Sequence, residues 1–546
     1  MERSKHPRTR PALHLAALSS RVVALVLALS GLPFAPVQQA LAQQPAGPLG
    51  IAVPHRYLVI YRDNSIPTDA GARVVSLGPG LGGAAATVRL IHVRQSATVA
   101  IVQASSYSDD AATLAALQAQ SDVEVAVHDR IVAAHNLILH AILPATVGVT
   151  VGTPTAAYDT YYTATPQGWA VVQAGGFGSN VPGGPGGLSG PARGPWNTTL
   201  GAGVRIAVLD SGVDQNHPDI APNLAFNLSE IDQSPMTGVP SACDDGSAQD
   251  QQGHGTWTAS LAAGALGPGT GEVIGVAPAA TLLNIKVLER LPDPASIAPD
   301  LATQCATGQA SGMLSWVLQG IGDAVSQHAN IISLSLGVLV DLDTGEGAGL
   351  QAVFDRVTYA AAQAGAVVIA SAGNDGVDLS NPRYIELPAQ SRGALAVVAS
   401  TNPACAENLA PGAVCAAGPA TLPYYSNFGS PLNAIAAPGG NLPDGPYTAV
   451  SGWVRGACSA GIAGTLDGPP TDSARSFGCF SLGHVQYLQA MGTSASAALT
   501  SGAAALLLAA NPTWTPTQVI AALRASATNT LSLTAAPQLN PAALFH

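Results

Sequence analysis

Five short and almost wholly apolar runs constrain the fold of this chain more than any other feature of its sequence. They occupy residues 204–209, 281–287, 330–336, 366–370 and 394–399. Such runs are typical of strands that are covered on both faces. Stretches with helical spacing lie between or after them, at residues 255–264, 313–328, 350–363, 493–510 and 515–525. Strands that alternate with helices predict an α/β fold of three layers, in which a mainly parallel sheet carries helices on both faces.

The first 42 residues have the pattern of a secretory signal. A basic start over residues 1–21 precedes an apolar run over 22–34, and Ala40-Leu41-Ala42 then matches a small-x-small cleavage site. The run is too short to anchor the chain across a bilayer, and the alternative is an uncleaved helix at the membrane interface. We therefore expect a secreted protein, extracellular or periplasmic, with no membrane contact once the signal is removed.

The six cysteines agree with export, because disulfides form in oxidising compartments. Six cysteines allow fifteen pairings, and their spacing fits no zinc motif. Closure of the local loops first predicts three pairs: Cys405 with Cys415, Cys458 with Cys479, and Cys243 with Cys305. The alternative is a set of free, buried thiols.

A small α+β unit is predicted between the signal and the body. Residues 56–62, 98–103 and 123–127 have strand patterns, and residues 109–120 have helical spacing with an acidic start. The unit spans residues 50–136 and contains no cysteine and no cluster of catalytic side chains. Its place in the chain indicates a pro-segment that assists folding and blocks a functional site.

Residues 137–200 show weaker patterning, and the stretch 175–195 is rich in Gly and Pro. This composition predicts an exposed linker rather than a packed element. We therefore expect residues 137–200 to form a linker and N-terminal arm that leads into a body at residues 201–546. The net charge of −12 argues against nucleic acid as a partner.

Four polar side chains stand where a parallel α/β sheet collects its functional groups. Asp210 and Asn374 each follow an apolar run, His254 stands between two glycines at the start of a helix pattern, and Ser494 opens an apolar helix. Taken singly, they are ordinary turn residues, a surface or capping histidine, and a helix N-cap. Together they predict a hydroxyl nucleophile, a general base with an orienting acid, and an amide that donates to an oxyanion.

The motifs around these residues resemble those of the subtilisin (subtilase) serine peptidases. In the order in which that family carries them, they read Asp210-Ser-Gly-Val-Asp, His217-Pro-Asp219, His254-Gly-Thr, Ser371-Ala-Gly-Asn374 and Gly492-Thr-Ser494. The resemblance covers about residues 200–546 and implies the three-layer subtilisin-like fold. Residues 50–136 similarly resemble the family's inhibitory pro-segment, a small α+β unit of ferredoxin-like fold.

The resemblance implies a serine endopeptidase that works through an acyl-enzyme. Ser494 would attack the scissile carbonyl, His254 would move the proton from the hydroxyl to the leaving amine, and Asp210 would orient the imidazole. Asn374 and the backbone N–H of Ser494 would form the oxyanion hole. The enzyme would be a self-processed zymogen with its own pro-segment as intramolecular inhibitor. It would act as a monomer on protein or peptide substrates and need no cofactor for the chemistry.

The resemblance also implies where a substrate lies. An extended peptide would pair as a strand with residues 310–312 and 335–337. Together with the walls of the first specificity pocket, the expected substrate-binding residues are Ser311, Gly312, Ser335, Leu336, Gly337, Ser371, Ala372 and Gly373. Glu386 falls near the floor of that pocket, where a carboxylate would select Arg or Lys. The alternative is an exposed loop glutamate.

The chain departs from the family pattern at two places near the expected site. Where the family carries Pro-His after the nucleophile, this chain has Ala498 and Leu499, so the helix lacks its usual proline. Trp257 replaces a residue that is commonly histidine.

Calcium is the one metal that the resemblance implies, at Asp219. Residues 265–271, where the family often supplies carboxamide ligands, contain no Asp, Asn or Glu. Calcium takes six to eight oxygen ligands, so this loop is a poor source of them. Asp244, Asp245 and Asp250 are an alternative site, although acidic loop clusters are usually only solvated.

Two other functions compete with an active endopeptidase. A catalytically inactive binding protein on the same scaffold would have no need for the four side chains together. An α/β-hydrolase esterase would carry its serine before its acid and histidine, whereas Ser494 comes last here. For the peptidase, we expect the main maturation cut between Asn136 and Thr165.

Overall fold

The computed structural model describes most of the body and part of the chain before it. The described residues are 51–64, 87–93, 97–104, 109–134, 168–178, 193–232, 241–266, 273–292, 301–306, 308–401, 420–429, 434–441, 454–462, 466–467, 480–481, 486–527 and 536–545. The predicted signal lies outside them.

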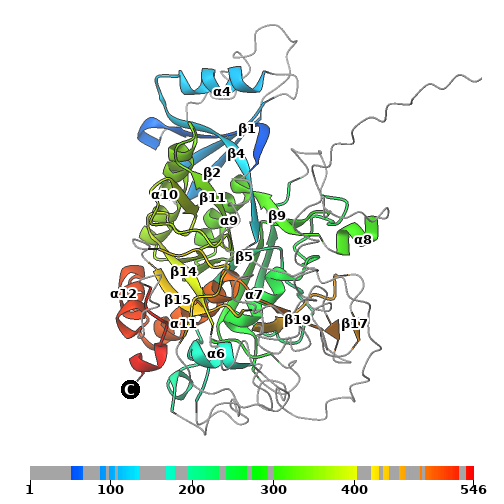
Figure 1. The fold of residues 1–546 in the computed structure, drawn as a ribbon, viewed down its shortest axis with the longest axis vertical. Helices are drawn as coiled ribbons and strands as arrows, with labels where there is room; N and C mark the ends of the chain where they lie inside the picture. Colours follow the sequence, from blue (N-terminus) through cyan, green and yellow to red (C-terminus); the bar gives the residue numbers. More distant parts are fainter. Residues whose placement is uncertain are drawn as a thin grey trace, which may run out of the picture. The chain divides into compact units, whose positions relative to one another are not determined.

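Seven parallel strands within the described ranges form the central sheet (Figure 1). In spatial order they are β15 (Ala434–Pro438), β14 (Ala394–Ser400), β12 (Val367–Ser371), β10 (Ile331–Leu334), β5 (Arg205–Asp210), β7 (Thr281–Lys286) and β6 (Leu224–Ser229). All neighbouring pairs are parallel, so their carboxyl ends share one edge of the sheet. The five runs predicted as strands all lie here. The sequence did not predict β6, an edge strand of alternating exposure, or β15, a short run of mainly alanine.

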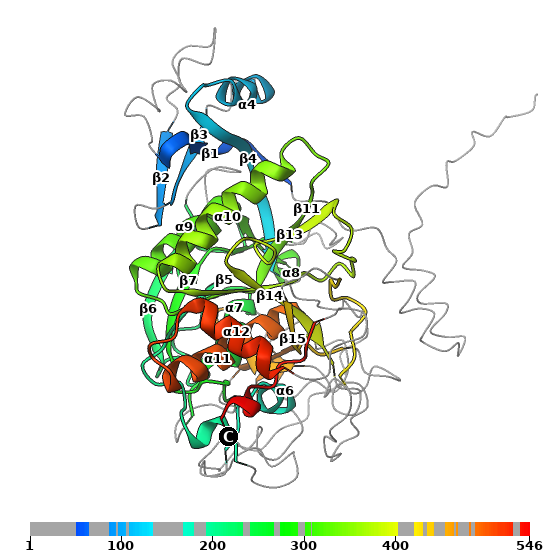
Figure 2. The same cartoon turned by 90° about the vertical axis from the view of Figure 1, so that its left-hand side faces the viewer.

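Helices cover both faces of this sheet, as predicted (Figure 2). One face carries α9 (Leu314–Ser326) and α10 (Gly347–Gln363), and the other carries α7 (His254–Ala263), α11 (Thr493–Ala510) and α12 (Pro516–Ser526). Alternate residues of β5 enter the two cores, because successive side chains of a strand point to opposite faces. Ala207 and Leu209 lie in the core with α9 and α10, and Ile206 and Val208 lie in the core with α7 and α11.

The apolar helix α11 is a core helix. In the part of the chain that the structure describes, it is the one helix long and apolar enough to cross a bilayer, and it is 89% buried inside the protein. Ala498 and Leu499, where the sequence departs from the family pattern, are both fully buried in this core. The helix therefore packs closely without the proline that its relatives carry.

An α+β unit precedes the body, as predicted. It contains β1 (Ala52–Tyr61), β2 (Thr87–Val93), β3 (Ala97–Gln103), α4 (Asp110–Gln118) and β4 (Val123–Ala134). The strands pair antiparallel in the order β4-β1-β3-β2. One face of this sheet packs under α4, and the other face joins the core that contains α9 and α10. The unit and the body thus share one hydrophobic core.

Part of the predicted linker is packed against the body instead of being exposed. Within 137–200, the structure describes residues 168–178 and 193–200, and there α6 (Trp169–Gln173) has four buried residues. Trp169 and Trp196 lie in the core with α7 and α11, and the Trp196 indole N–H donates to the Val276 carbonyl at 2.8 Å. The two tryptophans supply enough apolar surface to dock these residues, whereas most of the Gly- and Pro-rich stretch 175–195 lies outside the described ranges.

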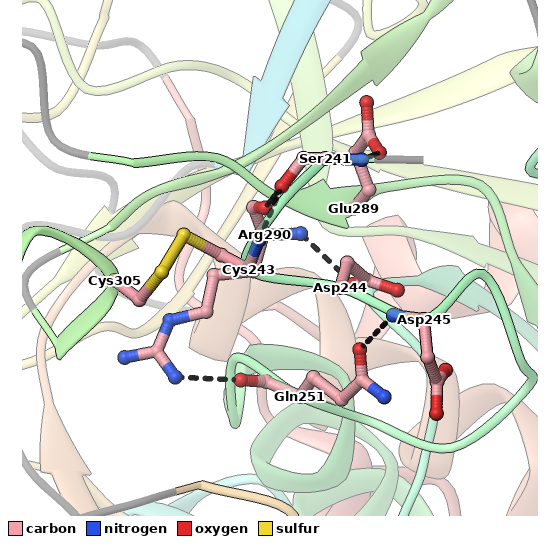
Figure 3. The surroundings of a disulfide bond; sticks show 8 residues. All are labelled: Ser241, Cys243, Asp244, Asp245, Gln251, Glu289, Arg290 and Cys305. Atoms are coloured by element: carbon pink, nitrogen blue, oxygen red, sulfur yellow. Dashed lines mark hydrogen bonds between the residues drawn. A yellow bond between two sulfur atoms is a disulfide. The ribbon is translucent and has the colours of Figure 1, made fainter. Parts of the chain in front are cut away.

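One of the three predicted disulfides is present among the described residues. Cys243 is bonded to Cys305 of α8 (Leu301–Ala306) (Figure 3). Cys458 is disulfide-bonded as well, and its predicted partner, Cys479, lies outside the described ranges. The predicted pair Cys405 and Cys415 also lies outside them. Cys458 follows β16 (Val454–Ala457), part of a small sheet with β17 (Leu466–Asp467), β18 (Phe480–Ser481) and β19 (Gln486–Ala490).

A buried ion pair links the α+β unit to the start of α9. Arg56 of β1 donates through Nε to Asp129 Oδ2 at 2.9 Å and through Nη2 to Ser315 Oγ at 2.8 Å. Asp129 Oδ1 accepts the backbone N–H of Ser315 at 3.1 Å and so caps α9, whose own N-cap residue provides no side-chain bond. Burial raises the pKa of the Asp129 carboxyl, and Arg56 opposes that effect.

We expect Arg56→Met to destabilise the full chain strongly, because it leaves Asp129 buried without its cation. Breaking one side of a buried ion pair costs about 3–5 kcal/mol. Urea unfolding, with Ser494→Ala in both proteins to remove the expected nucleophile, measures this loss. The matched control is Arg56→Met with Asp129→Asn, which removes both charges and keeps an acceptor for Ser315. Equal losses for the single and double variants would show that the pairing is unimportant.

Candidate active site

Asp210 and His254 meet at the carboxyl edge of the central sheet. Asp210 is the last residue of β5, and His254 is the first residue of α7. The imidazole Nδ1 lies 2.6 Å from Asp210 Oδ1, and both side chains are fully buried. The backbone N–H of Ser211 donates to the same oxygen at 2.7 Å. The ring is thus fixed by one nitrogen, and its Nε2 has no hydrogen-bond partner among the described residues.

Ser494 is the second residue of α11 and is fully buried. Its hydroxyl donates to the carbonyl of Ser335 at 3.0 Å, and the Ser335 hydroxyl donates back to the Ser494 carbonyl at 3.1 Å. Ser335 lies between β10 and β11 (Leu336–Asp341), so the predicted strand over 330–336 is divided at this residue. The expected hydrogen bond from Ser494 to His254 is therefore not formed in this structure.

Asn374 is oriented by the residue that precedes Ser494. Its Oδ1 accepts from the backbone N–H of Thr493 at 3.0 Å and from the Thr493 hydroxyl at 2.9 Å. The amide nitrogen Nδ2 is buried and has no partner among the described residues. The arrangement leaves both Nδ2 protons available to an acceptor, because a carboxamide carries two donors on that nitrogen.

Two residues near the acid and the base were not assigned to the site of Asp210 and His254 from the sequence. Asp250 is fully buried and accepts from the Ser211 hydroxyl at 3.0 Å and from the backbone N–H of Gly253 and Thr256 at 2.7 and 2.9 Å. Burial raises the pKa of this carboxyl. Thr258 donates its hydroxyl to Asp210 Oδ2 at 3.0 Å. Its spacing of four residues from His254 was the available signal, since residues i and i+4 share a helix face.

The last residues of β4 lie between the two strands expected to bind substrate. Val132 is opposite Gly312 of β9 (Ala310–Met313), and Ala133 is opposite Ser311. On the other side, Ala133 and Ala134 are opposite Gly337 and Leu336 of β11. The predicted strand over 123–127 therefore continues to Ala134, because β9 and β11 provide partners that the sequence pattern cannot reveal.

Glu386 is buried in β13 (Tyr384–Leu387), opposite Leu339 of β11. The interpretation as an exposed loop residue is therefore wrong. Its Oε2 lies 3.5 Å from Asn427 Nδ2, and a Cβ added to Gly373 would lie 2.9 Å from the same oxygen. The carboxyl thus lies against the predicted pocket wall that Ser371, Ala372 and Gly373 form. Burial, and secondarily Asp375, raise the pKa of Glu386 well above its ordinary value.

Asp219 is the position at which the resemblance implied calcium, and residues 267–272 of the neighbouring loop lie outside the described ranges. Asp219 is buried, its Oδ2 accepts the Val273 backbone N–H at 3.3 Å, and the other nearby ionisable group is His217, with its Nδ1 at 3.8 Å. No group of three or more His, Cys, Asp or Glu side chains within the described ranges is arranged to hold a metal.

The alternative acidic site is engaged by protein groups. Asp244 binds the Lys286 ammonium at 2.7 Å (Figure 3 shows the carboxylate beside Arg290), and Asp245 accepts from the backbone N–H of Ser247 at 2.8 Å. Asp250 is the buried carboxyl of the loop before His254.

The fold agrees with solved structures of related proteins. The epidermin leader peptide processing serine protease of Staphylococcus aureus matches with a TM-score of 0.52 and 16% identity, over 90% of this chain and 97% of its own. Fervidolysin from Fervidobacterium pennivorans, a keratinolytic enzyme related to subtilisin, matches with a TM-score of 0.56 and 19% identity, over 93% of this chain and 65% of its own. At these identities the likeness defines the class of fold, a three-layer α/β body of the subtilisin type.

Sequence comparison gives the family. The model of the subtilase family matches residues 201–541. Thermitase of Thermoactinomyces vulgaris is 32% identical over 50% of this chain and 77% of its own length. Subtilisin NAT of Bacillus subtilis subsp. natto is 30% identical over 60% of this chain and 61% of its own length, so less than two thirds of that relative is spanned. The chain belongs to the subtilase family of serine peptidases.

A histidine at the boundary of the α+β unit bridges two carboxylates. His128 of β4 lies 2.9 Å from Glu346 Oε1 through Nδ1 and 3.2 Å from Asp110 Oδ2 through Nε2. Glu346 is the N-cap residue of α10 in the body, and Asp110 starts α4. The hydrogen bond to Glu346 raises the pKa of His128. Burial by itself raises the pKa of Glu346, but the hydrogen bonds with His128 oppose it, and the net shift is downward.

We expect this contact to weaken as the pH rises. A raised folded pKa means that the stabilisation is fully present below the ordinary histidine pKa of about 6.5 and is lost as the pH passes through the folded value. In the Ser494→Ala chain, the rate of amide hydrogen exchange in β4 should rise with pH more steeply than the intrinsic exchange rate does. His128→Gln should remove this additional pH dependence.

Other titratable and charged groups lie close to the two carboxylates that His128 bridges. Arg130 lies 3.8 Å from Glu346, His55 lies 3.8 Å from Asp110, and the Tyr57 hydroxyl donates to Asp110 at 2.6 Å. Glu346→Gln is the matched control, because it removes the partner and should reduce the same additional pH dependence. Equal pH dependence in the parent and both variants would contradict a role for His128.

Proposed function

We propose that this chain is a secreted serine endopeptidase that forms an acyl-enzyme on Ser494 and matures from a zymogen by cutting itself. Residues 1–42 would be the signal, 50–136 the inhibitory pro-segment and 137–200 the N-terminal arm of the mature enzyme. The observation that carries the proposal is the 2.6 Å contact between His254 Nδ1 and Asp210 Oδ1, at the sheet edge where α11 presents Ser494. The enzyme would act as a monomer and need no cofactor for the chemistry.

In the proposed reaction the Ser494 hydroxyl leaves the Ser335 carbonyl and donates to His254 Nε2. As Oγ attacks the scissile carbonyl, Nε2 takes the proton, and Asp210 stabilises the imidazolium that forms. The new oxyanion accepts from Asn374 Nδ2 and from the Ser494 backbone N–H. The imidazolium then protonates the leaving amine, and a water molecule activated by the same base hydrolyses the acyl-enzyme. Among the residues that the structure describes, His254 Nε2 and Asn374 Nδ2 have no hydrogen-bond partner, which supports these two roles.

The pairing of β4 with β9 and β11 supports both substrate binding and inhibition. A peptide that adds a strand between two site strands gains backbone hydrogen bonds whatever its sequence. Residues 131–134 do this from within the same chain, opposite Ser311, Gly312, Leu336 and Gly337. A foreign substrate would have to displace them, so the α+β unit would inhibit by occupying the substrate seat.

The register also indicates which bond is cut first. Ala134, the last residue of β4, is opposite Leu336, which directly follows Ser335 in the chain. The Ser335 carbonyl is the group that the Ser494 hydroxyl contacts. We therefore expect cleavage between His135 and Asn136, at the N-terminal limit of the segment that the sequence alone suggested.

Secreted wild-type protein should begin at Asn136, and the Ser494→Ala variant should retain residues N-terminal to it. N-terminal sequencing and intact mass of both proteins measure this. A serine-directed phosphonyl reagent should label wild type and not the variant. Absence of labelling would favour the inactive binding protein, whereas labelling with equal processing of both proteins would remove only self-cleavage.

We further propose that the first specificity pocket selects a basic side chain. Glu386 is buried against Gly373 with its pKa raised, and an arriving guanidinium or ammonium group would favour its ionised form. His135, the residue before the expected cut, also has a side chain that can carry positive charge.

Turnover of matched peptides that end in Arg, Leu or Phe tests this pocket. Wild type should prefer Arg, and Glu386→Gln should lower kcat/KM for Arg about 10- to 100-fold, because a charge-assisted hydrogen bond is worth about 1.5–3 kcal/mol. The Leu and Phe peptides are the internal control and should change little. A wild-type preference for Leu or Phe refutes a basic-selecting pocket.

A further inference from the structure

The Asp210 carboxylate is held at both oxygens. Oδ1 accepts from His254 Nδ1 at 2.6 Å and from the Ser211 backbone N–H at 2.7 Å. Oδ2 accepts from the Thr258 hydroxyl at 3.0 Å. Asp210 and His254 are fully buried and Thr258 is 1% exposed, so water does not compete for these positions.

Helix α7 places the imidazole and this hydroxyl on the same side. His254 and Thr258 are four residues apart, so they stand one above the other on one helix face. All ten residues of α7 are buried, which fixes the helix against β5 and α11. The Thr258 hydroxyl also lies 3.2 Å from the Gly255 carbonyl, but its single proton serves one acceptor at a time. The carboxylate is both closer and more highly charged.

We infer that Thr258 is a positioning residue for the proposed reaction, acting on His254 through the second oxygen of Asp210. The inference rests on the proposed function. A hydroxyl donor spreads part of the negative charge of Asp210 away from Oδ1. The acid then stabilises the imidazolium less strongly than it would without this donor. The same donor prevents the carboxylate from rotating out of the imidazole plane.

The other charged groups near Asp210 are held by their own partners. Lys286 is opposite Asp210 in the β5–β7 register, and its ammonium binds Asp244 and the Gln249 carbonyl. Asp250 accepts from Thr256 and from backbone N–H groups, and Arg290 donates to the Gln251 carbonyl. A change confined to the Thr258 hydroxyl leaves these contacts in place.

The test is the pH dependence of kcat/KM of the self-processed enzyme on one peptide substrate. Thr258→Val replaces the hydroxyl by a methyl of similar size, and we expect the acid limb to move to higher pH by roughly half a unit. Activity below that limb should therefore fall about threefold more than activity on the plateau. Thr258→Ser keeps the hydroxyl and should restore the wild-type limb.

Thr500→Val is the matched control. Thr500 is a fully buried helical threonine of α11 whose hydroxyl donates to the Ser496 carbonyl, so the substitution makes the same chemical change away from Asp210. It should leave the acid limb where it is in wild type. Should Thr258→Val fail to fold by circular dichroism, Thr258→Ala takes its place with the same expected shift.

Three results would overturn the inference. One is an unchanged limb in Thr258→Val, and another is the same shift in Thr258→Ser. A uniform loss at every pH would indicate structural support alone. Each of these leaves the proposed function intact, because the wild-type enzyme is active in all of them. An inactive wild type would instead overturn the proposed function.

Discussion

The structure depends on removing one carboxylate from water at the end of a buried strand. Asp210 has no exposed surface, and a buried charge is costly unless donors surround it. The donors come from three places along the chain: the next residue, Ser211, and the two residues His254 and Thr258 on one face of α7. The position of α7, and with it the direction of the imidazole, follows from meeting this requirement.

The α+β unit and the body are joined by one continuous hydrophobic core. Leu58, Ile60 and Val99 belong to the same buried cluster as Val353 and Phe354 of α10. A unit that shares a core in this way stabilises α9 and α10 by covering apolar surface that would otherwise face water. Its last strand then runs between β9 and β11, so the shared core and this strand pairing are parts of one interface.

The sequence predicted what depends on local pattern and missed what depends on distant partners. Buried parallel strands have continuous apolar runs, so β5, β7, β10, β12 and β14 were found, and glycine-flanked motifs marked Asp210, His254 and Ser494. The extension of β4 to Ala134 was not predicted, because it requires β9 and β11, which lie far away in the chain.

The same limit applies to single side chains around the site. The sequence suggested that Asp250 is a solvated carboxylate in a loop, yet its two oxygens accept hydrogen bonds from the hydroxyls of Ser211 and Thr256. Only assembly of the fold distinguishes a carboxylate that organises a loop from one that faces water. Thr258 lies four residues after His254, a spacing that places both on one helix face. A threonine hydroxyl inside a helix, however, usually donates to a backbone carbonyl of the preceding turn, and no local pattern favours Asp210 as the acceptor instead.

The buried carboxylates differ in whether a positive side chain is bonded to them in the resting protein. This difference distinguishes a structural role from the chemical role that we propose. Asp129 has Arg56 and Asp244 has Lys286 in the resting protein. A carboxylate that is always paired with Arg or Lys stabilises the fold, and its negative charge is already compensated. Asp210 is bonded to an imidazole and to two uncharged donors, so in the proposed reaction it would stabilise the positive charge that His254 gains when the imidazolium forms.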